Sequence, residues 1–200
     1  MRRTMSLVVI VLAACFFLQA QEPPKVEIFG GYSLARITDQ GVVQKHIFNN
    51  RWNSEINFNF DKHLGIVGDF GGYYGTHTGP SFTQFTCFGC PITFPGPVVT
   101  TQFHTFLFGP QVSARVNSFT PFGHVLFGAI HAREDASAGV FPPFTVSASA
   151  FAFAVGGGLD TSLSHRIAWR VQADYLGTRL FDIRENNLRV STGVVFRFGD

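Results

Sequence analysis

The sequence is poor in charge and, beyond its first twenty residues, lacks a long apolar run. Charged residues make up only 14% of the 200 residues, whereas phenylalanine alone occurs 24 times. No later segment supplies the roughly eighteen consecutive apolar residues of a membrane-spanning helix, which argues against a helical membrane protein. A soluble domain has difficulty hiding so many rings. The composition therefore favours a chain whose apolar surface faces lipid.

The first twenty residues have the pattern of an export signal. Arg2 and Arg3 precede an almost wholly apolar stretch over residues 7–18, and Ala20 offers a small residue at a cleavage position. We therefore expect a signal peptide over residues 1–20 and a mature domain over residues 21–200. Residues 12–15 also resemble a lipobox, which would make Cys15 a lipidated N-terminus, although the apolar stretch continues beyond that cysteine.

Removing this signal leaves a chain without net charge. The two arginines in it reduce the 15 basic residues to 13, which equals the number of acidic residues. Electrostatic binding of nucleic acid needs a concentrated basic face. We expect no nucleic-acid partner.

Period-two alternation of apolar and polar residues, bounded by turn residues, predicts strands rather than helices. Each predicted strand is close to or above the roughly 9–11 residues that a tilted strand needs to cross a bilayer. The predicted strands are residues 25–36, 52–60, 64–75, 102–115, 119–132, 146–160, 166–179 and 188–198.

The connections between these segments alternate in length. Residues 61–63, 116–118 and 161–165 are short polar turns, and the longer connections carry most of the Pro, Asn and Thr; they are residues 37–51, 76–101, 133–145 and 180–187. This alternation is typical of outer-membrane barrels, with short periplasmic turns and long external loops. We predict an all-β fold, an eight-stranded antiparallel up-and-down transmembrane barrel with both ends in the periplasm.

Alternation sorts the side chains into two faces without saying which faces inward. In residues 166–179, Trp169 and Tyr175 share the apolar face, whereas Arg170, Gln172 and Asp174 share the polar face. A soluble lipocalin-like barrel that binds a small ligand would place the apolar face inside. The final segment favours the opposite arrangement.

The final predicted strand carries an aromatic pattern of membrane insertion. Ser191, Gly193, Phe196 and Phe198 match the polar-x-Gly-x-x-aromatic-x-aromatic signal of the outer-membrane insertion machinery. Together with the export signal, this pattern predicts that the apolar face contacts lipid.

The residues also resemble a known family, the outer-membrane β-barrel domain proteins related to the OmpA and OmpX transmembrane barrels. The matching stretches are residues 26–33, 65–70, 106–110, 156–160, 174–175 and 187–199. The resemblance implies a barrel in the outer membrane of a Gram-negative bacterium, surrounded by lipid and lipopolysaccharide, and we expect a monomer. Full-length OmpA carries a peptidoglycan-binding domain, which we do not expect here.

Charged residues of both signs are predicted to face the lumen. They are Glu27, Glu55, Asp69, Arg115, Asp160, Arg170, Asp174, Arg189 and Arg197. Eight strands enclose an interior only wide enough for side chains, where an unpaired charge is costly. We expect an ion-paired plug. The alternative is a narrow passive pore for ions or small solutes.

We expect no catalytic, cofactor-binding or metal-binding residues. Carboxylates such as Asp69 and Asp174 would need an open cleft and a shifted pKa to act as acids or bases, and the neighbouring arginines should keep them ionised. The seven histidines show no HxH or HExxH spacing. A non-enzymatic structural or surface-interaction protein is the favoured function.

The connection over residues 76–101 is the expected place for an external ligand. It contains Cys87 and Cys90, which we predict to form a local disulfide in an exported protein. Its apolar residues would either bind a partner or fold back over the barrel mouth; they are Phe82, Phe85, Phe88, Ile92 and Phe94.

Overall fold

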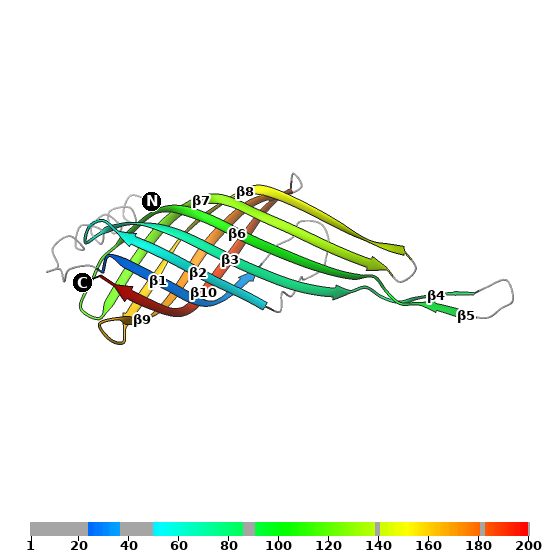
Figure 1. Cartoon of the computed structure of the whole chain (residues 1–200), viewed down its shortest axis with the longest axis horizontal. Helices are drawn as coiled ribbons and strands as arrows, with labels where there is room; N and C mark the ends of the chain where they lie inside the picture. The colour runs from blue at the N-terminus through cyan, green and yellow to red at the C-terminus, as the bar shows by residue number, and fades with distance from the viewer. Residues whose placement is uncertain (1–23, 37–49, 86–90, 139–140, 181–182, 200) are drawn as a thin grey trace, which may run out of the picture.

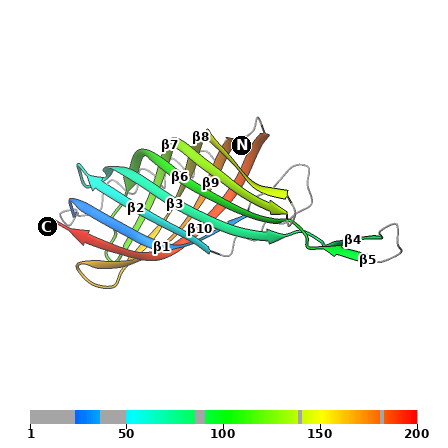
Figure 2. The same ribbon diagram turned by 45° about the vertical axis from the view of Figure 1, so that its right-hand side comes forward.

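The computed structural model describes residues 24–36, 50–85, 91–138, 141–180 and 183–199, and these residues form strands and their connections. The strands are β1 (Val26–Arg36), β2 (Asn50–Asn59), β3 (Leu64–Thr78), β4 (Phe82–Phe85), β5 (Pro91–Phe94), β6 (Val98–Ser113), β7 (Phe119–Ala138), β8 (Phe141–Ser162), β9 (Ile167–Leu180) and β10 (Ile183–Phe198). Eight of them close an antiparallel barrel in the order β1-β10-β9-β8-β7-β6-β3-β2, and β4 pairs with β5 in a separate hairpin. Figures 1 and 2 show the barrel and the projecting hairpin from two directions. The predicted eight-stranded barrel is confirmed.

The two ends of the barrel differ. The connections β2–β3, β6–β7 and β8–β9 are short and lie at the end where β1 begins and β10 finishes, which we call the turn end (Figure 1). The opposite end, from which the β4–β5 hairpin projects, we call the loop end. The three predicted short turns thus lie together at one end of the barrel, whereas at the loop end β7 and β8, and likewise β9 and β10, are separated by only two residues.

The β6–β7 turn shows how local chemistry fixes the pairing of neighbouring strands. The backbone amides of Val116 and Phe119 each donate to the carbonyl of the other, at 2.8 and 2.9 Å. Between them Asn117 adopts a φ of 54°, in the left-handed region that asparagine tolerates better than most residues. A two-residue turn of this kind holds the register of the long β6–β7 pair.

Several strands extend farther at the loop end than the sequence predicts. β7 continues to Ala138 and β8 begins at Phe141, so most of the predicted loop 133–145 is strand. Likewise β9 and β10 continue into the predicted loop 180–187. Beyond the apolar belt both faces of a strand meet water, so the alternation that identifies strands disappears there even though the pairing continues.

The longest strands continue past the rim as an open sheet. β8 pairs with β9 only from Ala152 onward, while its residues 141–151 pair with β7 alone. We call the outer parts of β3, β6, β7 and β8 beyond the rim the sheet extension. It forms the right-hand part of the barrel body in Figure 1.

The predicted loop 76–101 contains a second element, the β4–β5 hairpin. It joins the sheet extension through a narrow neck, where the Gly79 amide donates to the Pro97 carbonyl at 2.7 Å. Along the hairpin the hydroxyls of Thr83 and Thr93 lie 3.0 Å apart. Cys87 and Cys90, with the predicted disulfide, fall outside the described residues, as do Cys15 and the predicted signal over residues 1–20.

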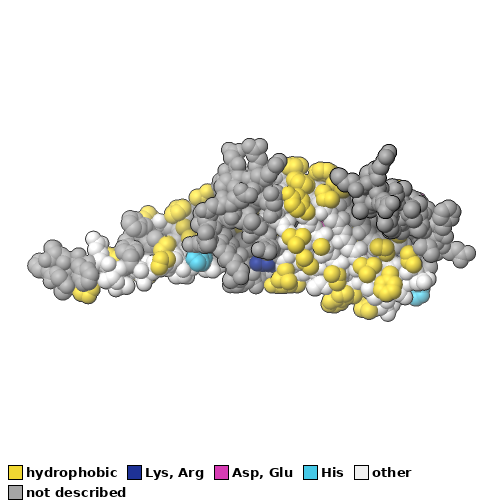
Figure 3. Space-filling view, turned by 180° about the vertical axis from the view of Figure 1, so that it is seen from behind, with side chains coloured by type: hydrophobic (Ala, Val, Ile, Leu, Met, Phe, Trp, Pro, Cys, Tyr) yellow, Lys and Arg dark blue, Asp and Glu magenta, His cyan; other side chains and the backbone are white. Residues whose placement is uncertain are grey.

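Apolar side chains cover the outer wall and polar ones fill much of the interior. On β7, Val125 and Phe127 are exposed, whereas His124 and Leu126, which alternate with them, are buried. Figure 3 shows apolar side chains spread over the wall turned to the viewer, with few charged ones among them. Within the described residues, no helix has the length and apolar character needed to cross a membrane.

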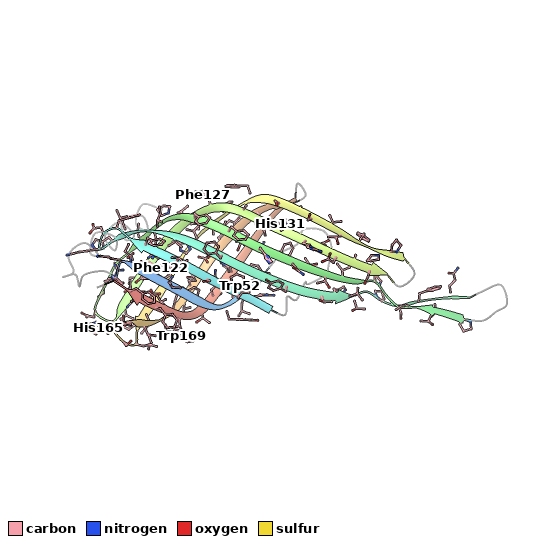
Figure 4. All side chains as sticks on the ribbon, in the orientation of Figure 1. Trp52, Phe122, Phe127, His131, His165 and Trp169 are labelled. Carbon is pink, nitrogen blue, oxygen red and sulfur yellow. The ribbon has the colours of Figure 1, made fainter. Side chains whose placement is uncertain are left out.

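Aromatic residues mark the two margins of this apolar wall. Figure 4 places Trp169 and His165 toward the turn end and Trp52 farther toward the loop end. Both tryptophans are close to half-exposed on the outer face, Trp52 at 41% and Trp169 at 45%. Rings at both margins are typical of the two interfacial girdles of outer-membrane barrels.

The interior is less uniformly polar than the alternation predicts. An apolar cluster lies inside the wall formed by β3 and β6–β9; it comprises Val67, Leu107, Leu126, Ile130, Ala132, Ala152, Ala154 and Leu176. A barrel of eight strands is filled by its own side chains, so apolar residues can occupy the interior as well as polar ones. Part of the lumen is therefore packed by apolar contacts alone.

Candidate functional site

Arg170 on β9 is the centre of one buried cluster in the lumen. Its Nε and Nη2 donate to the two carboxylate oxygens of Asp160 on β8, at 2.7 and 2.9 Å. Its Nη1 donates to Glu55 on β2 at 2.7 Å, on the other side of the interior. The guanidinium carbon also lies 4.3 Å from the centroid of the Phe122 ring and 5.3 Å from that of Phe29. The carboxylate oxygens and the flanking rings together stabilise the positive charge of Arg170, which is only 1% exposed.

Arg189 on β10 is the centre of a second cluster. Its Nη1 and Nη2 donate to the two oxygens of Asp69 on β3, at 2.9 and 2.7 Å. Its Nε donates to Asp174 on β9 at 3.0 Å. The second oxygen of Asp174 contacts Nε2 of His124 on β7 at 2.8 Å. This cluster connects four strands across the lumen.

Two amide side chains join the clusters. Gln172 Nε2 donates to Glu55 and, at 3.3 Å, to the Asn53 side-chain oxygen. Asn53 Nδ2 in turn donates to Asp69 at 3.0 Å. A continuous chain of hydrogen bonds therefore runs from Asp160 to His124, and we call these nine residues the luminal network: Asn53, Glu55, Asp69, His124, Asp160, Arg170, Gln172, Asp174 and Arg189.

A looser group lies nearer the turn end. Glu27 Oε1 lies 3.3 Å from Arg197 Nε and 3.6 Å from Arg115 Nη2, distances of ion pairs without hydrogen-bond geometry. Arg197 also approaches Asp160 at 3.7 Å, which places this group next to the luminal network. Asn57 donates to the other oxygen of Glu27 at 3.1 Å.

Arg115 differs from its predicted position. The sequence places it in a strand over residues 102–115, but β6 ends at Ser113 and Arg115 belongs to the following connection. From there its Nη1 donates to the Lys62 carbonyl of the neighbouring turn at 2.7 Å. Its length allows it to reach the lumen from outside the strand.

All nine charged residues predicted to face the lumen thus take part in these contacts. The sequence prediction does not include the uncharged residues that bond to them or His124. Asn53, Asn57 and Gln172 lie on predicted polar faces, so alternation offers a signal for them. His124 has no such signal, because its neighbours on the inner face of β7, Phe122 and Leu126, are apolar.

The arrangement leaves each buried carboxylate beside a guanidinium. Asp160 and Asp69 each accept two hydrogen bonds from one arginine, a geometry that fixes the orientation of the carboxylate. Within the described ranges, no group of three or more His, Cys, Asp or Glu side chains is placed to hold a metal ion. The physical effect of such a network is to link strands across the lumen and to fill the space between them.

The four residues of the predicted insertion signal occupy both faces of β10. Phe196 and Phe198 are exposed on the outer wall, and Ser191 is buried, with its hydroxyl donating to Ser33 at 3.1 Å. Gly193 lies against the backbone of Gly30 and Gly31 on β1, where the barrel closes. An added methyl group there would overlap the Gly30 carbonyl.

Comparison with known proteins agrees with this architecture. Ail of Yersinia pestis, solved in complex with the heparin analogue sucrose octasulfate, superimposes with a TM-score of 0.63 at 17% identity, over 87% of this chain and 99% of Ail. Neisserial surface protein A superimposes with a TM-score of 0.55 at 8% identity, over 87% of this chain and 97% of the other. At these identities the likeness concerns the fold. None of the curated proteins matches the sequence significantly.

Family membership follows from the sequence itself. The outer membrane protein β-barrel domain family matches residues 6–198, nearly the whole chain. This match agrees with the closed barrel of eight antiparallel strands and its apolar outer wall. The chain belongs to the outer membrane β-barrel domain family, and it is a barrel of the bacterial outer membrane.

Proposed function

We propose that the protein is a non-enzymatic outer-membrane barrel with a closed lumen, whose sheet extension and β4–β5 hairpin are its interaction surface. The observation that carries this proposal is the luminal network, in which Arg170 and Arg189 link opposite walls of the barrel. An eight-stranded barrel has little interior space. Side chains that bond across this space oppose the passage of hydrated solutes.

The exposed surface beyond the rim supports the second half of the proposal. Four strands and a hairpin continue past the barrel at the loop end, which on this proposal faces the cell exterior. The projecting parts of these strands lie beyond the barrel wall, so they are not needed to span the bilayer. Phe144 and Val146 on β8 are exposed there, at 63% and 42%. Exposed apolar side chains beyond the membrane favour contact with a partner.

The remaining parts of the proposal concern assembly. A signal peptide over residues 1–20 would direct export, and the aromatic end of β10 would be read by the outer-membrane insertion machinery. The folded chain would then be a monomer whose barrel is closed by the pairing of β1 with β10. Lipid and lipopolysaccharide would surround the apolar wall.

Liposome swelling tests the closed lumen against the passive pore. The full chain is refolded into liposomes that contain an impermeant sugar, and light scattering is followed after dilution into arabinose or glycine. We expect the swelling rate of protein-free liposomes. Swelling that rises in proportion to the amount of folded protein would instead establish the pore.

A hairpin deletion tests the interaction surface. Residues 80–96 are replaced by Asn-Gly, since the neck residues Gly79 and Pro97 are already hydrogen-bonded across the gap. Cells that display the intact chain, the deletion variant or no barrel are compared for retention on immobilised heparin and for self-aggregation. The proposal expects retention or aggregation above the empty cells that is lost with the hairpin. Equal behaviour of all three strains would contradict it.

A further inference from the structure

Two histidines are neighbours on the outer wall although they are far apart in sequence. His104 on β6 and His131 on β7 are direct cross-strand partners. Both point outward, because the outward-facing residues two positions away are Phe106 on β6 and Ala129 on β7. Directly opposed residues of antiparallel strands have Cβ atoms about 4.5–5.5 Å apart. At that separation two imidazole rings can reach one ion.

Each of the two rings is held by a neighbouring side chain. Nε2 of His104 lies 3.3 Å from the Tyr74 hydroxyl, and the Tyr74 ring meets the imidazole edge-to-face with centroids 5.5 Å apart. Nδ1 of His131 lies 2.9 Å from the Ser149 hydroxyl. A hydrogen bond to one ring nitrogen fixes the tautomer and orientation of a metal-binding histidine. In the described part of the chain, the other nitrogens, Nδ1 of His104 and Nε2 of His131, have no hydrogen-bond partner.

The pair lies where water reaches the wall. The outward-facing residues one step nearer the turn end are apolar, as with Phe106 and Phe151, and those one step farther out are polar, as with Gln102 and Arg133. His131 is exposed and His104 partly so, and Figure 4 marks His131 on the loop-end side of Phe127. The site is thus at the margin of the apolar belt and open to solvent ions.

The surrounding charges favour a metal cation over an anion. Arg133 is the nearest basic residue on the outer face of β7, and its guanidinium is already bonded to Asp135 at 3.1 Å. This contact, together with a hydrogen bond from Thr145, holds the pKa of the Asp135 carboxyl below its ordinary value, so the pair stays charged and mutually neutralised near neutral pH. An anion would therefore meet little free positive charge at this site, whereas neutral imidazoles are ligands for Zn²⁺, Cu²⁺ and Ni²⁺.

We propose that His104 and His131 form a surface site for a borderline transition-metal ion, Zn²⁺, Cu²⁺ or Ni²⁺. The two imidazoles supply two ligands, and water completes the coordination, because the described residues offer no third His, Cys, Asp or Glu there. Tyr74 and Ser149 are positioning residues, because each holds one nitrogen of its histidine ring and leaves the other nitrogen for the metal ion. The site is independent of the luminal network and of the state of the lumen.

Copper binding to the untagged full chain, refolded in detergent micelles, tests the proposal. Cu²⁺ is titrated in a non-coordinating buffer at pH 7.5 and followed by electron paramagnetic resonance and by calorimetry. We expect one site with the hyperfine pattern of two imidazole nitrogens. Affinity should fall when the pH is lowered, because protons compete with the metal ion for the same nitrogens.

Substitutions identify the ligands. His104→Gln and His131→Gln should each weaken binding by more than about tenfold and leave one-nitrogen coupling, while Tyr74→Phe and Ser149→Ala should weaken it by up to about tenfold. His77→Gln and His165→Gln are matched controls, since both residues are exposed elsewhere, and they should leave the site unchanged. Heat-modifiable gel migration verifies that each variant folds. Binding that survives either ligand substitution, or no two-nitrogen site in the folded wild-type chain, would overturn the proposal.

Discussion

Arg189 and Asp69 form a two-pronged ion pair between β10 and β3, with both oxygens of the carboxylate within 2.9 Å of the guanidinium nitrogens. The two residues are 120 positions apart in sequence, and both side chains are fully buried. Such a pair cannot form until the barrel closes. It therefore reports on closure of the barrel, as the pairing of β1 with β10 does.

Removing Arg189 should destabilise the barrel strongly. Arg189→Met leaves Asp69 and Asp174 without their shared guanidinium, and a buried charge deprived of its partner costs about 3–5 kcal/mol. Urea unfolding from lipid vesicles, followed by tryptophan fluorescence, measures the difference in free energy. Arg133→Met is the control, because its pair with Asp135 is exposed and should contribute little. Equal stabilities of Arg189→Met and the wild type would mean that the buried pair is not formed.

Removing both central arginines should open a path for cations. In Arg170→Ser/Arg189→Ser the carboxylates Glu55, Asp69 and Asp174 remain in the lumen with space beside them. The lumen then carries net negative charge, so any conductance should favour potassium over chloride. Reversal potentials in a salt gradient measure this preference, on protein whose gel migration shows that it is folded. An anion preference would contradict the assigned positions of these acids.

Adding a side chain at Gly72 should displace Trp52. The indole of Trp52 on β2 lies over Gly72 on β3, and a Cβ at that position would overlap the ring. In a Trp169→Phe background, Gly72→Ala should shift the fluorescence emission maximum of the remaining tryptophan. Gly30→Ala is the matched control, because nothing lies within 4 Å of its added methyl group. An unchanged emission spectrum in Gly72→Ala would show that the ring does not cover this glycine.

The left-handed turn residue should tolerate glycine but not valine. Asn117 has a φ of 54°, a conformation that costs a β-branched residue about 1–2 kcal/mol. Asn117→Val should therefore lower the free energy of unfolding by that amount, and Asn117→Gly should leave it nearly unchanged. If the two variants were equally stable, the turn would have another conformation.

The sequence predicts those strands that have lipid on one face and the polar lumen on the other. Strands such as β9 alternate Trp169 outside with Arg170 inside, because one face meets lipid and the other meets polar partners. Where water lies on both sides, as around Asp135 on β7 and Thr145 on β8, alternation no longer follows the strand, and the sequence predicts a loop. The outermost part of the sheet extension and the β4–β5 hairpin are absent from the sequence-based prediction for that reason.

The luminal network is likewise predicted only in part from the sequence. Composition and alternation indicate which charges face inward, since Glu55 and Arg170 lie on the polar sides of their strands. They do not indicate that these two residues bond to each other, because the placement of β2 relative to β9 depends on the closure of β1 on β10 and on the register of the intervening pairs. His104 and His131 lie symmetrically about the turn at residues 117–118, but no short metal-binding spacing joins them, so their pairing follows only from the register of β6 with β7.

The closed lumen is the central claim, and single-channel recording tests it most directly. The refolded full chain is incorporated into planar bilayers in 1 M potassium chloride, and incorporation is verified by recovery of heat-modifiable protein from the membrane. We predict no steady conductance, because Arg170 and Arg189 bond to opposite walls across the interior. A steady, reproducible unit conductance from the folded wild-type protein would contradict the closed lumen.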